Sequence, residues 1–147
     1  MAFLSFRRSF RTRTRLITSS NIFLFREIEN VVSFLSPASN PERTITESRK
    51  IGMRIISEMN NALQQHIPNC VGRYDDGFNA NCVGDSFQMK QTPTILYETG
   101  HYKNDYDREE VRRFAYQALV AGLSYIANND ITGTNYKSYF EIPENQK

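Results

Sequence analysis

The stretch "TPTILYETGHYKNDYDREEVRRF", residues 92–114, decides how this chain folds because it joins a short apolar strand to the start of a helix. Residues 95–97 predict the strand, and Glu98 stands at its end. An ionised carboxylate at the end of a buried strand is costly unless it is paired, hydrogen-bonded or bound to a ligand. Glu98 is therefore either a structural acid or a catalytic acid or base at the end of a strand, where open α/β sheets place their ligands.

A helix is predicted upstream, from a cap at Thr44 or Thr46 to about Ile67, the residue before Pro68. Glu47 occupies the capping-box position relative to Thr44. Apolar residues spaced as on one helical face are expected to pack on a sheet: Ile51, Ile55, Ile56, Met59 and Leu63. The charged residues expected on the solvent side are Arg49, Lys50, Arg54 and Glu58.

The remaining segments complete a simple order of elements. Residues 31–35, "VVSFL", predict a second strand, and residues 69–91 predict one long ordered loop that builds a site. A second helix is predicted from Tyr106 or Asp107 to Ala127, capped by Asp105 or Asp107. Its apolar stripe comprises Val111, Phe114, Ala115, Ala118, Leu119, Gly122, Leu123 and Ile126. Strand, helix, loop, strand and helix predict a piece of an α/β sheet with parallel pairing, followed by a weakly ordered tail from Asp130.

Composition indicates one globular domain with an unusual beginning. The chain has 147 residues, 39% of them hydrophobic, and no apolar run approaches the roughly 18 residues of a membrane helix. Residues 1–26 hold six arginines and no acid, so 12 basic and all 16 acidic residues lie in residues 27–147. The arginines are Arg7, Arg8, Arg11, Arg13, Arg15 and Arg26.

Three interpretations of this basic leader stay open. Its arginine-rich, serine-containing, acid-free composition is typical of organelle-targeting segments. Arginines interleaved with phenylalanines also suit nucleic acid or an anionic membrane surface. The third interpretation is an extension without a folded role, such as a mispredicted or frame-shifted start, and we expect residues 1–30 to be a disordered leader. A secretory signal is excluded because no apolar run of about 7–15 residues follows the charges.

The two cysteines and two histidines give little support to a metal site. Cys70 and Cys82 do not make a disulfide framework, and no pair among these cysteines and His66 and His101 has the spacing of a zinc knuckle. Idle thiols in a reducing compartment are expected, which favours the cytoplasm.

Two segments, "VSFLSPASNPERTITESRKIGMRIISEMN" and "QTPTILYETGHYKNDYDREEVRRFAYQAL", resemble the C-terminal part of the zinc carboxypeptidase family, the carboxypeptidase A-like metallopeptidases. The similarity covers about residues 31–127 and is most specific around Glu98 and in "DDGFNANCVGDSF". It implies an α/β fold, here the C-terminal fragment of a mixed, mostly parallel sheet flanked by helices, over residues 31–128, with a polar tail at 129–147. It also implies cleavage of C-terminal residues from peptides with one zinc ion and a glutamate on a late strand.

The resemblance assigns roles to four residues. Glu98 matches the family's general acid/base, which takes a proton from water and later delivers one to the leaving amine. Tyr74 is the best candidate for a tyrosine on a mobile loop that closes over substrate, although a packed loop aromatic is an equal alternative. Asp85, in "GDSF", falls where the family shapes its specificity pocket. His101 is expected in a surface turn or beside Glu98 rather than as a zinc ligand.

The chain departs from the family where the metal should be. The family holds zinc with an H-x-x-E motif and a later histidine, whereas this chain has only His66, in "HIPN", and His101. We therefore expect zinc to be absent from this chain alone and the chain to be inactive by itself. Missing strands would leave an exposed sheet edge, which predicts poor solubility or association with a part that supplies the rest. The expected partners are that part and peptide or protein C-termini, not nucleic acid or membrane.

Two alternatives from other classes remain. One is a non-catalytic α/β module that binds peptides or regulates a partner. The other is a protein that binds nucleic acid or membrane surfaces through the arginine leader, and it predicts strongly salt-dependent binding.

Glu98 also has a structural alternative, in which its carboxylate forms an ion pair with Arg108 or Arg112.

Overall fold

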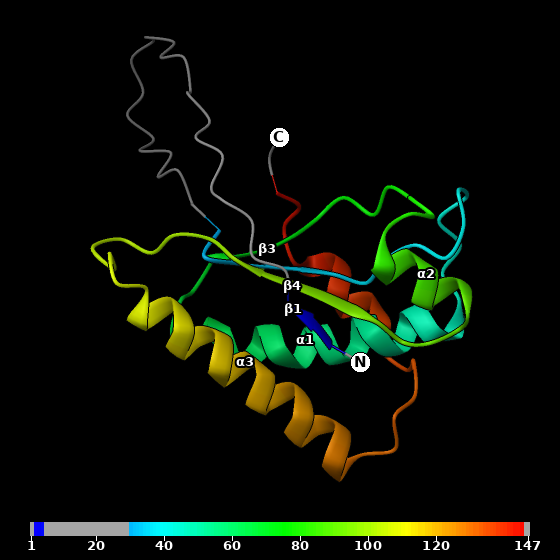
Figure 1. Ribbon diagram of the computed structural model, residues 1–147. Coiled ribbons are helices and arrows are strands. Elements are labelled where there is room, and N and C mark those ends of the chain that lie inside the picture. The colour runs from blue at the N-terminus through cyan, green and yellow to red at the C-terminus, as the bar shows by residue number, and fades with distance from the viewer. Residues whose placement is uncertain (1, 5–29, 146–147) are drawn as a thin grey trace, which may run out of the picture.

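The chain folds as an α/β domain in which a small mixed sheet is flanked by helices (Figure 1). The computed structural model describes residues 2–4 and 30–145. In chain order the elements are β1 (Ala2–Leu4), β2 (Val32–Leu35), α1 (Glu47–Gln64), β3 (Val71–Arg73), α2 (Val83–Met89), β4 (Ile95–Thr99), α3 (Glu109–Asn128) and the 3-10 helix η1 (Tyr136–Glu141). The expectations for residue 1, residues 5–29 and residues 146–147 lie outside this described part.

The sheet is mixed, as predicted, but its central pairing is antiparallel. The strand order is β1-β4-β2-β3, with β2 parallel to β3, antiparallel to β4, and β1 beside β4 in parallel. The expectation of parallel pairing between the two predicted strands, β2 and β4, is therefore wrong. The pairing is antiparallel because of strand β3, which was not predicted from the sequence. Helix α1 makes the crossover from β2 to β3, and the chain then returns in the opposite direction as β4. Because Ala2–Leu4 form β1, the expectation of a disordered leader does not hold for these three residues.

The two faces of the sheet differ sharply. On the helix face, Phe34 lies opposite Tyr97 in the β2–β4 register, and their rings stack with centroids 5.0 Å apart. Both are buried in the core with α1, the helix that contacts β2, β3 and β4. On the outer face, Ser33 lies opposite Glu98 and Leu35 lies opposite Leu96. Side chains alternate between faces along a strand, so the side chains of residues 97 and 98 of β4 lie on opposite faces of the sheet.

Helix α1 is capped by Thr46, whose hydroxyl accepts a hydrogen bond from the Arg49 N–H at 3.4 Å. The Thr44 alternative is wrong, because the Thr44 hydroxyl bonds with Asn40 instead. Of the predicted core positions, Ile55, Ile56, Met59 and Leu63 are buried, and Ile51 is half-buried against the core. The prediction that Arg49 faces solvent is wrong: Arg49 is only 1% exposed.

Helix α3 begins at Glu109, later than predicted, and Asp105 caps it from a distance. The Asp105 carboxylate accepts hydrogen bonds from the N–H groups of Glu110 and Val111, at 3.2 and 2.9 Å. Desolvation raises the pKa of Asp105, but these hydrogen bonds and the Arg108 charge outweigh it and hold the pKa below its ordinary value. The prediction that the Asp105 side chain caps this helix is confirmed by these hydrogen bonds, although Arg108 occupies the N-cap position.

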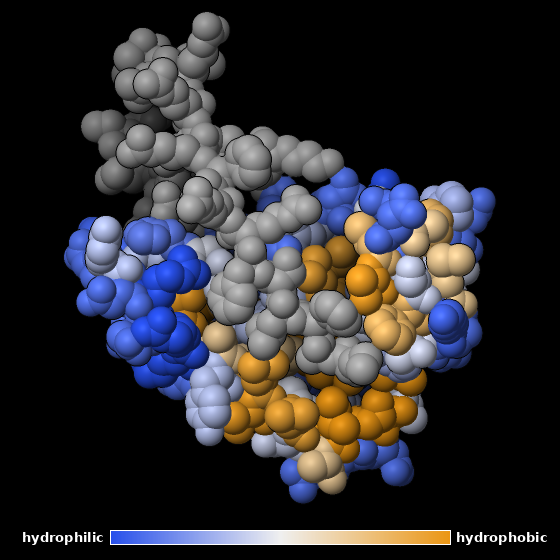
Figure 2. All heavy atoms as spheres, viewed as in Figure 1, coloured by the Kyte–Doolittle hydropathy of each residue, from blue (hydrophilic) through white to orange (hydrophobic). Residues whose placement is uncertain are grey.

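Only part of the predicted α3 stripe is buried. Val111, Phe114, Ala118 and Gly122 face α1, whereas Leu123 and Ile126 are 64% and 43% exposed. Apolar residues therefore gather on the surface over the C-terminal half of α3 (Figure 2). Among the helices of the described part, none is both long and apolar enough to cross a membrane.

The segments expected to be irregular contain regular structure. Residues 69–91 are ordered, as predicted, but they include strand β3 and helix α2. The tail from Asp130 is not weakly ordered: it forms η1 against α1 and buries Tyr139 and Ile142 at 2% exposure each. It then runs along β3, where the Arg73 N–H donates to the Pro143 carbonyl at 2.9 Å and the Asn145 N–H donates to the Arg73 carbonyl at 2.9 Å. This pairing satisfies backbone groups at a sheet edge that would otherwise be open.

Candidate functional site

The structure brings Glu98 and Tyr74 together at the outer face of the sheet. Glu98 is the fourth residue of β4, and Tyr74 directly follows β3. The Tyr74 hydroxyl donates a hydrogen bond to Oε2 of Glu98 at 2.7 Å, in a half-buried position. A phenol–carboxylate bond of this length is charge-assisted, which makes it stronger than a bond between two neutral groups. The bond thus fixes the position of the Glu98 carboxylate at the outer face of the sheet.

The polar groups beside this pair fix the sheet surface from which it projects. Asn145 Nδ2 donates to Ser33 Oγ at 3.2 Å, and Asn30 Nδ2 donates to Asn145 Oδ1 at 2.7 Å. These side chains lie directly over Gly72, where a Cβ atom would approach Asn145 Oδ1 to 2.0 Å. A glycine in β3 therefore lets the C-terminal segment lie close to the strand beside Ser33, the register partner of Glu98.

Glu98 makes no ion pair with any described residue, so the ion pair with Arg108 or Arg112 that the structural alternative expected is not formed. Arg108 instead turns its guanidinium to the backbone at the end of β4, donating to the Gly100 carbonyl at 2.9 Å. Arg112 pairs with Glu109 on the surface of α3. Both arginines thus bond to groups around α3, and Glu98 instead accepts a hydrogen bond from the Tyr74 hydroxyl.

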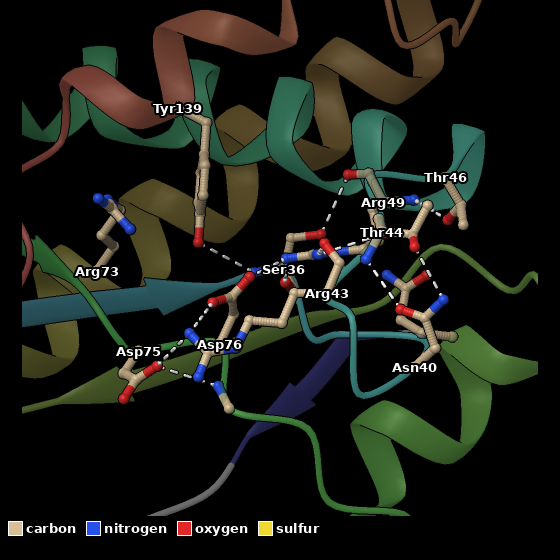
Figure 3. Close-up of polar contacts among 12 residues, drawn as sticks. Ser36, Asn40, Arg43, Thr44, Thr46, Arg49, Arg73, Asp75, Asp76 and Tyr139 are labelled. Atoms are coloured by element: carbon tan, nitrogen blue, oxygen red, sulfur yellow. Dashed lines mark hydrogen bonds and ion pairs between the residues drawn. The ribbon is translucent and has the colours of Figure 1, made fainter.

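A buried arginine holds the segment that follows Tyr74 (Figure 3). Arg49 Nη2 lies 2.6 Å from Asp76 Oδ2 and 3.1 Å from the Ser36 carbonyl, and Nη1 lies 2.7 Å from the Arg43 carbonyl. The exposed side chain of Arg43 bridges Asp75 and Asp76 at 3.3 Å each. We call Arg43, Arg49, Asp75 and Asp76 the arginine–aspartate cluster. It connects the start of α1 to the loop beyond β3.

Asp85 lies apart from the Tyr74–Glu98 pair, in the first turn of α2. It is 7% exposed, and its carboxylate accepts a weak hydrogen bond of 3.5 Å from the Asn79 N–H. Burial raises the pKa of Asp85, while the Asn79 hydrogen bond and the Arg49 charge act in the opposite direction. The same helix is attached to α1 by Gln88, whose side-chain oxygen accepts from the Ser48 hydroxyl at 2.8 Å. Asp85 thus bonds to a residue six positions earlier, in the loop that leads into α2.

The candidate metal ligands do not come together. His101 is exposed after β4, and within the described part it makes no hydrogen bond to Glu98. His66 lies exposed beyond the end of α1, and Cys82 is also exposed. Residues 30–145 contain no group of three or more His, Cys, Asp and Glu side chains placed to hold a metal ion. The residues described thus do not fit the zinc that the family resemblance implies.

Sequence reasoning found Tyr74 and Glu98 but missed Arg49 and Asp76. One signal was available in α1: Arg49, Gly52, Met53 and Ile56 follow the i, i+3, i+4, i+7 spacing of a single face, and all four are buried. An arginine that shares a buried stripe needs an acidic partner, and "YDD" supplies one.

No family model, curated protein or solved structure matches the chain.

Proposed function

We propose that this chain is the part of a carboxypeptidase-like peptidase that carries its general acid/base, Glu98. One observation supports the proposal above all others: the Tyr74 hydroxyl donates to Oε2 of Glu98 at 2.7 Å. These are the two residues that the family resemblance assigned to proton transfer and to substrate closure. They lie 24 positions apart in the sequence, and β3 and β4 bring them together across β2.

The geometry suits proton transfer by Glu98. A general base must project from a rigid element and keep an oxygen free for the proton it accepts. Glu98 stands on a strand that is hydrogen-bonded to β2, and Tyr74 occupies only one side of one carboxylate oxygen. In the proposed reaction Glu98 takes a proton from the attacking water and passes a proton to the amine that leaves. Tyr74 holds the carboxylate in place until substrate draws the phenol away.

The described residues do not fit a zinc ion, so we derive no step through a metal. His66 and His101 are both exposed, and no third ligand joins them in residues 30–145. The proposed activity therefore requires a second polypeptide that brings the H-x-x-E motif and the later histidine. Leu123 and other exposed apolar residues of α3 offer surface for such an association.

The test is reconstitution with that second part. The purified chain is mixed with the N-terminal two thirds of a carboxypeptidase A-like enzyme, and release of C-terminal amino acids from a peptide mixture is followed by mass spectrometry. We expect no release from either part alone and release from the mixture. Glu98→Gln should lower turnover by about 10²–10⁴-fold, the usual contribution of a general acid/base.

Matched controls make the result specific. Glu58→Gln replaces an acid of the same size that pairs with Arg54 on α1, the helix that packs against the opposite face of the sheet, and should leave turnover unchanged. Zinc measured in the isolated mixture by plasma mass spectrometry reports assembly independently of turnover. A zinc-loaded mixture that cleaves equally well with Gln at position 98, or that cleaves nothing, would show that the proposal is wrong.

A further inference from the structure

We infer that Arg49 and Asp76 are positioning residues, which hold the Tyr74 hydroxyl on Glu98 through the single residue, Asp75, that joins Tyr74 to Asp76. The catalytic consequence of this inference rests on the proposed function. The positioning itself is a property of the fold and can be measured without any activity.

Arg49 is placed as a fixed point rather than as a surface charge. Its side chain is 1% exposed, and its guanidinium donates to three carbonyl groups, those of Ser36, Arg43 and Thr44. The Arg43 backbone that accepts one of these bonds is left-handed, with φ of 56°, which is an unfavourable conformation for a bulky side chain. The hydrogen bond from Arg49 helps to hold this conformation. The same Nη2 that donates to the Ser36 carbonyl also donates to Asp76 Oδ2 at 2.6 Å.

Tyr74 is confined between this fixed point and the sheet. Its N–H donates to the Phe34 carbonyl at 2.9 Å, which extends the β2–β3 pairing to the tyrosine. Two residues later, Asp76 is bound to Arg49. A chain segment fixed at both ends has few backbone conformations left. In the conformation that it adopts, the Tyr74 hydroxyl reaches Glu98.

Energetics favour a positioning role over a purely stabilising one. Removing a guanidinium from water is costly, and a buried ion pair commonly adds little net stability compared with an apolar pair of the same shape. The Nε atom of Arg49 is buried without a hydrogen-bond partner among the described residues, which adds to that cost. Apolar residues at positions 49 and 76 would avoid the cost of burying the guanidinium. What they would lose is a directional bond that fixes the register of the Tyr74 segment.

The experiment measures the Tyr74–Glu98 hydrogen bond directly. The chain is labelled with ¹³C at the tyrosine Cζ carbon, and the Tyr74 resonance is identified by its loss in Tyr74→Phe. Glu98→Gln then gives the position of that resonance when the charged acceptor is gone. Asp76→Asn, which keeps size but removes the charge facing Arg49, should move the Tyr74 resonance toward the Glu98→Gln position or split it into several.

Two further variants decide the result. Arg49→Lys keeps the positive charge but loses the fork that reaches Asp76 and the carbonyl groups together, and it should cause the same change. Glu58→Gln removes another ion pair of α1, with Arg54, on the side of the helix away from the loop, and should leave Tyr74 unchanged. If Asp76→Asn does not fold, as judged by circular dichroism, Arg49→Lys carries the test. A Tyr74 resonance that stays in its wild-type position in a folded variant would overturn the inference.

Reconstitution separates the two proposals. In the active mixture, Asp76→Asn should lower turnover about tenfold, and combining it with Tyr74→Phe should cost no more than Tyr74→Phe alone, because the two changes remove one interaction. Additive losses would contradict positioning through Tyr74. A Tyr74 resonance that depends on Asp76 in a mixture without peptidase activity would uphold the inference and reject the proposed function.

Discussion

The two faces of the sheet treat the same residue type in opposite ways. Tyr97 lies on the helix face at 1% exposure, stacked on Phe34, and its hydroxyl has no hydrogen-bond partner in the described structure. Tyr74 lies at the outer face, half-buried, and its hydroxyl is bound to Glu98. Burial without a partner raises the pKa of the Tyr97 phenol far above its ordinary value. The helix face is thus organised by packing, and the outer face by hydrogen bonds.

This difference separates what stabilises the chain from what the chain offers to a substrate. Apolar burial on the helix face is the dominant favourable contribution to folding. Polar groups on the outer face bring smaller net energies, but their bonds are directional and set the positions of individual atoms. The effects of substitutions on the free energy of unfolding should therefore differ in size between the two faces. For the two tyrosines these effects should also differ in sign.

The largest effect is expected at Phe34. Phe34→Ala removes a fully buried ring from between Tyr97 and α1, and it should lower the free energy of unfolding by about 3–5 kcal/mol. Leu35→Ala, one position along the strand and only half-buried on the outer face, serves as the control and should cost less. Urea denaturation followed by circular dichroism measures both. Equal losses would show that the outer face is packed as tightly as the helix face.

The same tyrosine-to-phenylalanine change should have opposite signs on the two faces. Tyr97→Phe removes a buried hydroxyl that has no partner and should raise the free energy of unfolding by about 1 kcal/mol. Tyr74→Phe removes the bond to Glu98 and should lower it by about 1 kcal/mol. Thermal unfolding of the two variants side by side tests this contrast. A loss of stability in Tyr97→Phe would mean that its hydroxyl is satisfied, for instance by an internal water.

The smallest effect is expected at Asp85 and depends on pH. The raised pKa of Asp85 means that the folded chain binds its proton more tightly than the unfolded chain, so ionisation of Asp85 opposes folding as pH rises above its ordinary pKa of 3.8. Asp85→Asn should therefore stabilise the chain at pH 7, and the gain should shrink as pH falls through the raised pKa of folded Asp85 and vanish below 3.8. Unfolding midpoints at several pH values measure it. A gain that grows on acidification would contradict the raised pKa.

Sequence periodicity predicted α1 and α3 because apolar residues recur over many turns in each, whereas the short helix α2 was missed. Ile55, Met59 and Leu63 recur at helical spacing, and such a pattern is hard to produce by chance over a helix of 18 residues. Strand β3 escaped prediction because it has three residues, one of them Gly72, and offers no period to detect. Without β3 the crossover could not be placed, and the antiparallel pairing of β2 with β4 followed from that crossover.

The residues of the candidate site also differ in whether the sequence alone could identify them. Glu98 could be found from local sequence because a carboxylate at the end of an apolar strand is unusual in itself. Its partner Tyr74 was identified only through the family resemblance, since no local pattern points to a residue across the sheet. Arg49 was misplaced because charge was taken as a sign of exposure, although its spacing matches Met53 and Ile56 on the buried face. Burial of an arginine depends on a distant acid, and the chain places Asp76 there only after folding.

Gly72 carries a consequence for how this sequence can vary. Its backbone is not left-handed, so conformation alone would accept any residue there. What excludes a side chain is the pair of amides from Asn30 and Asn145, which lie within 2.5 Å of where a Cβ atom would stand. Positions 30, 72 and 145 should therefore co-vary among relatives of this chain, with any larger residue at 72 accompanied by shorter ones at the other two positions.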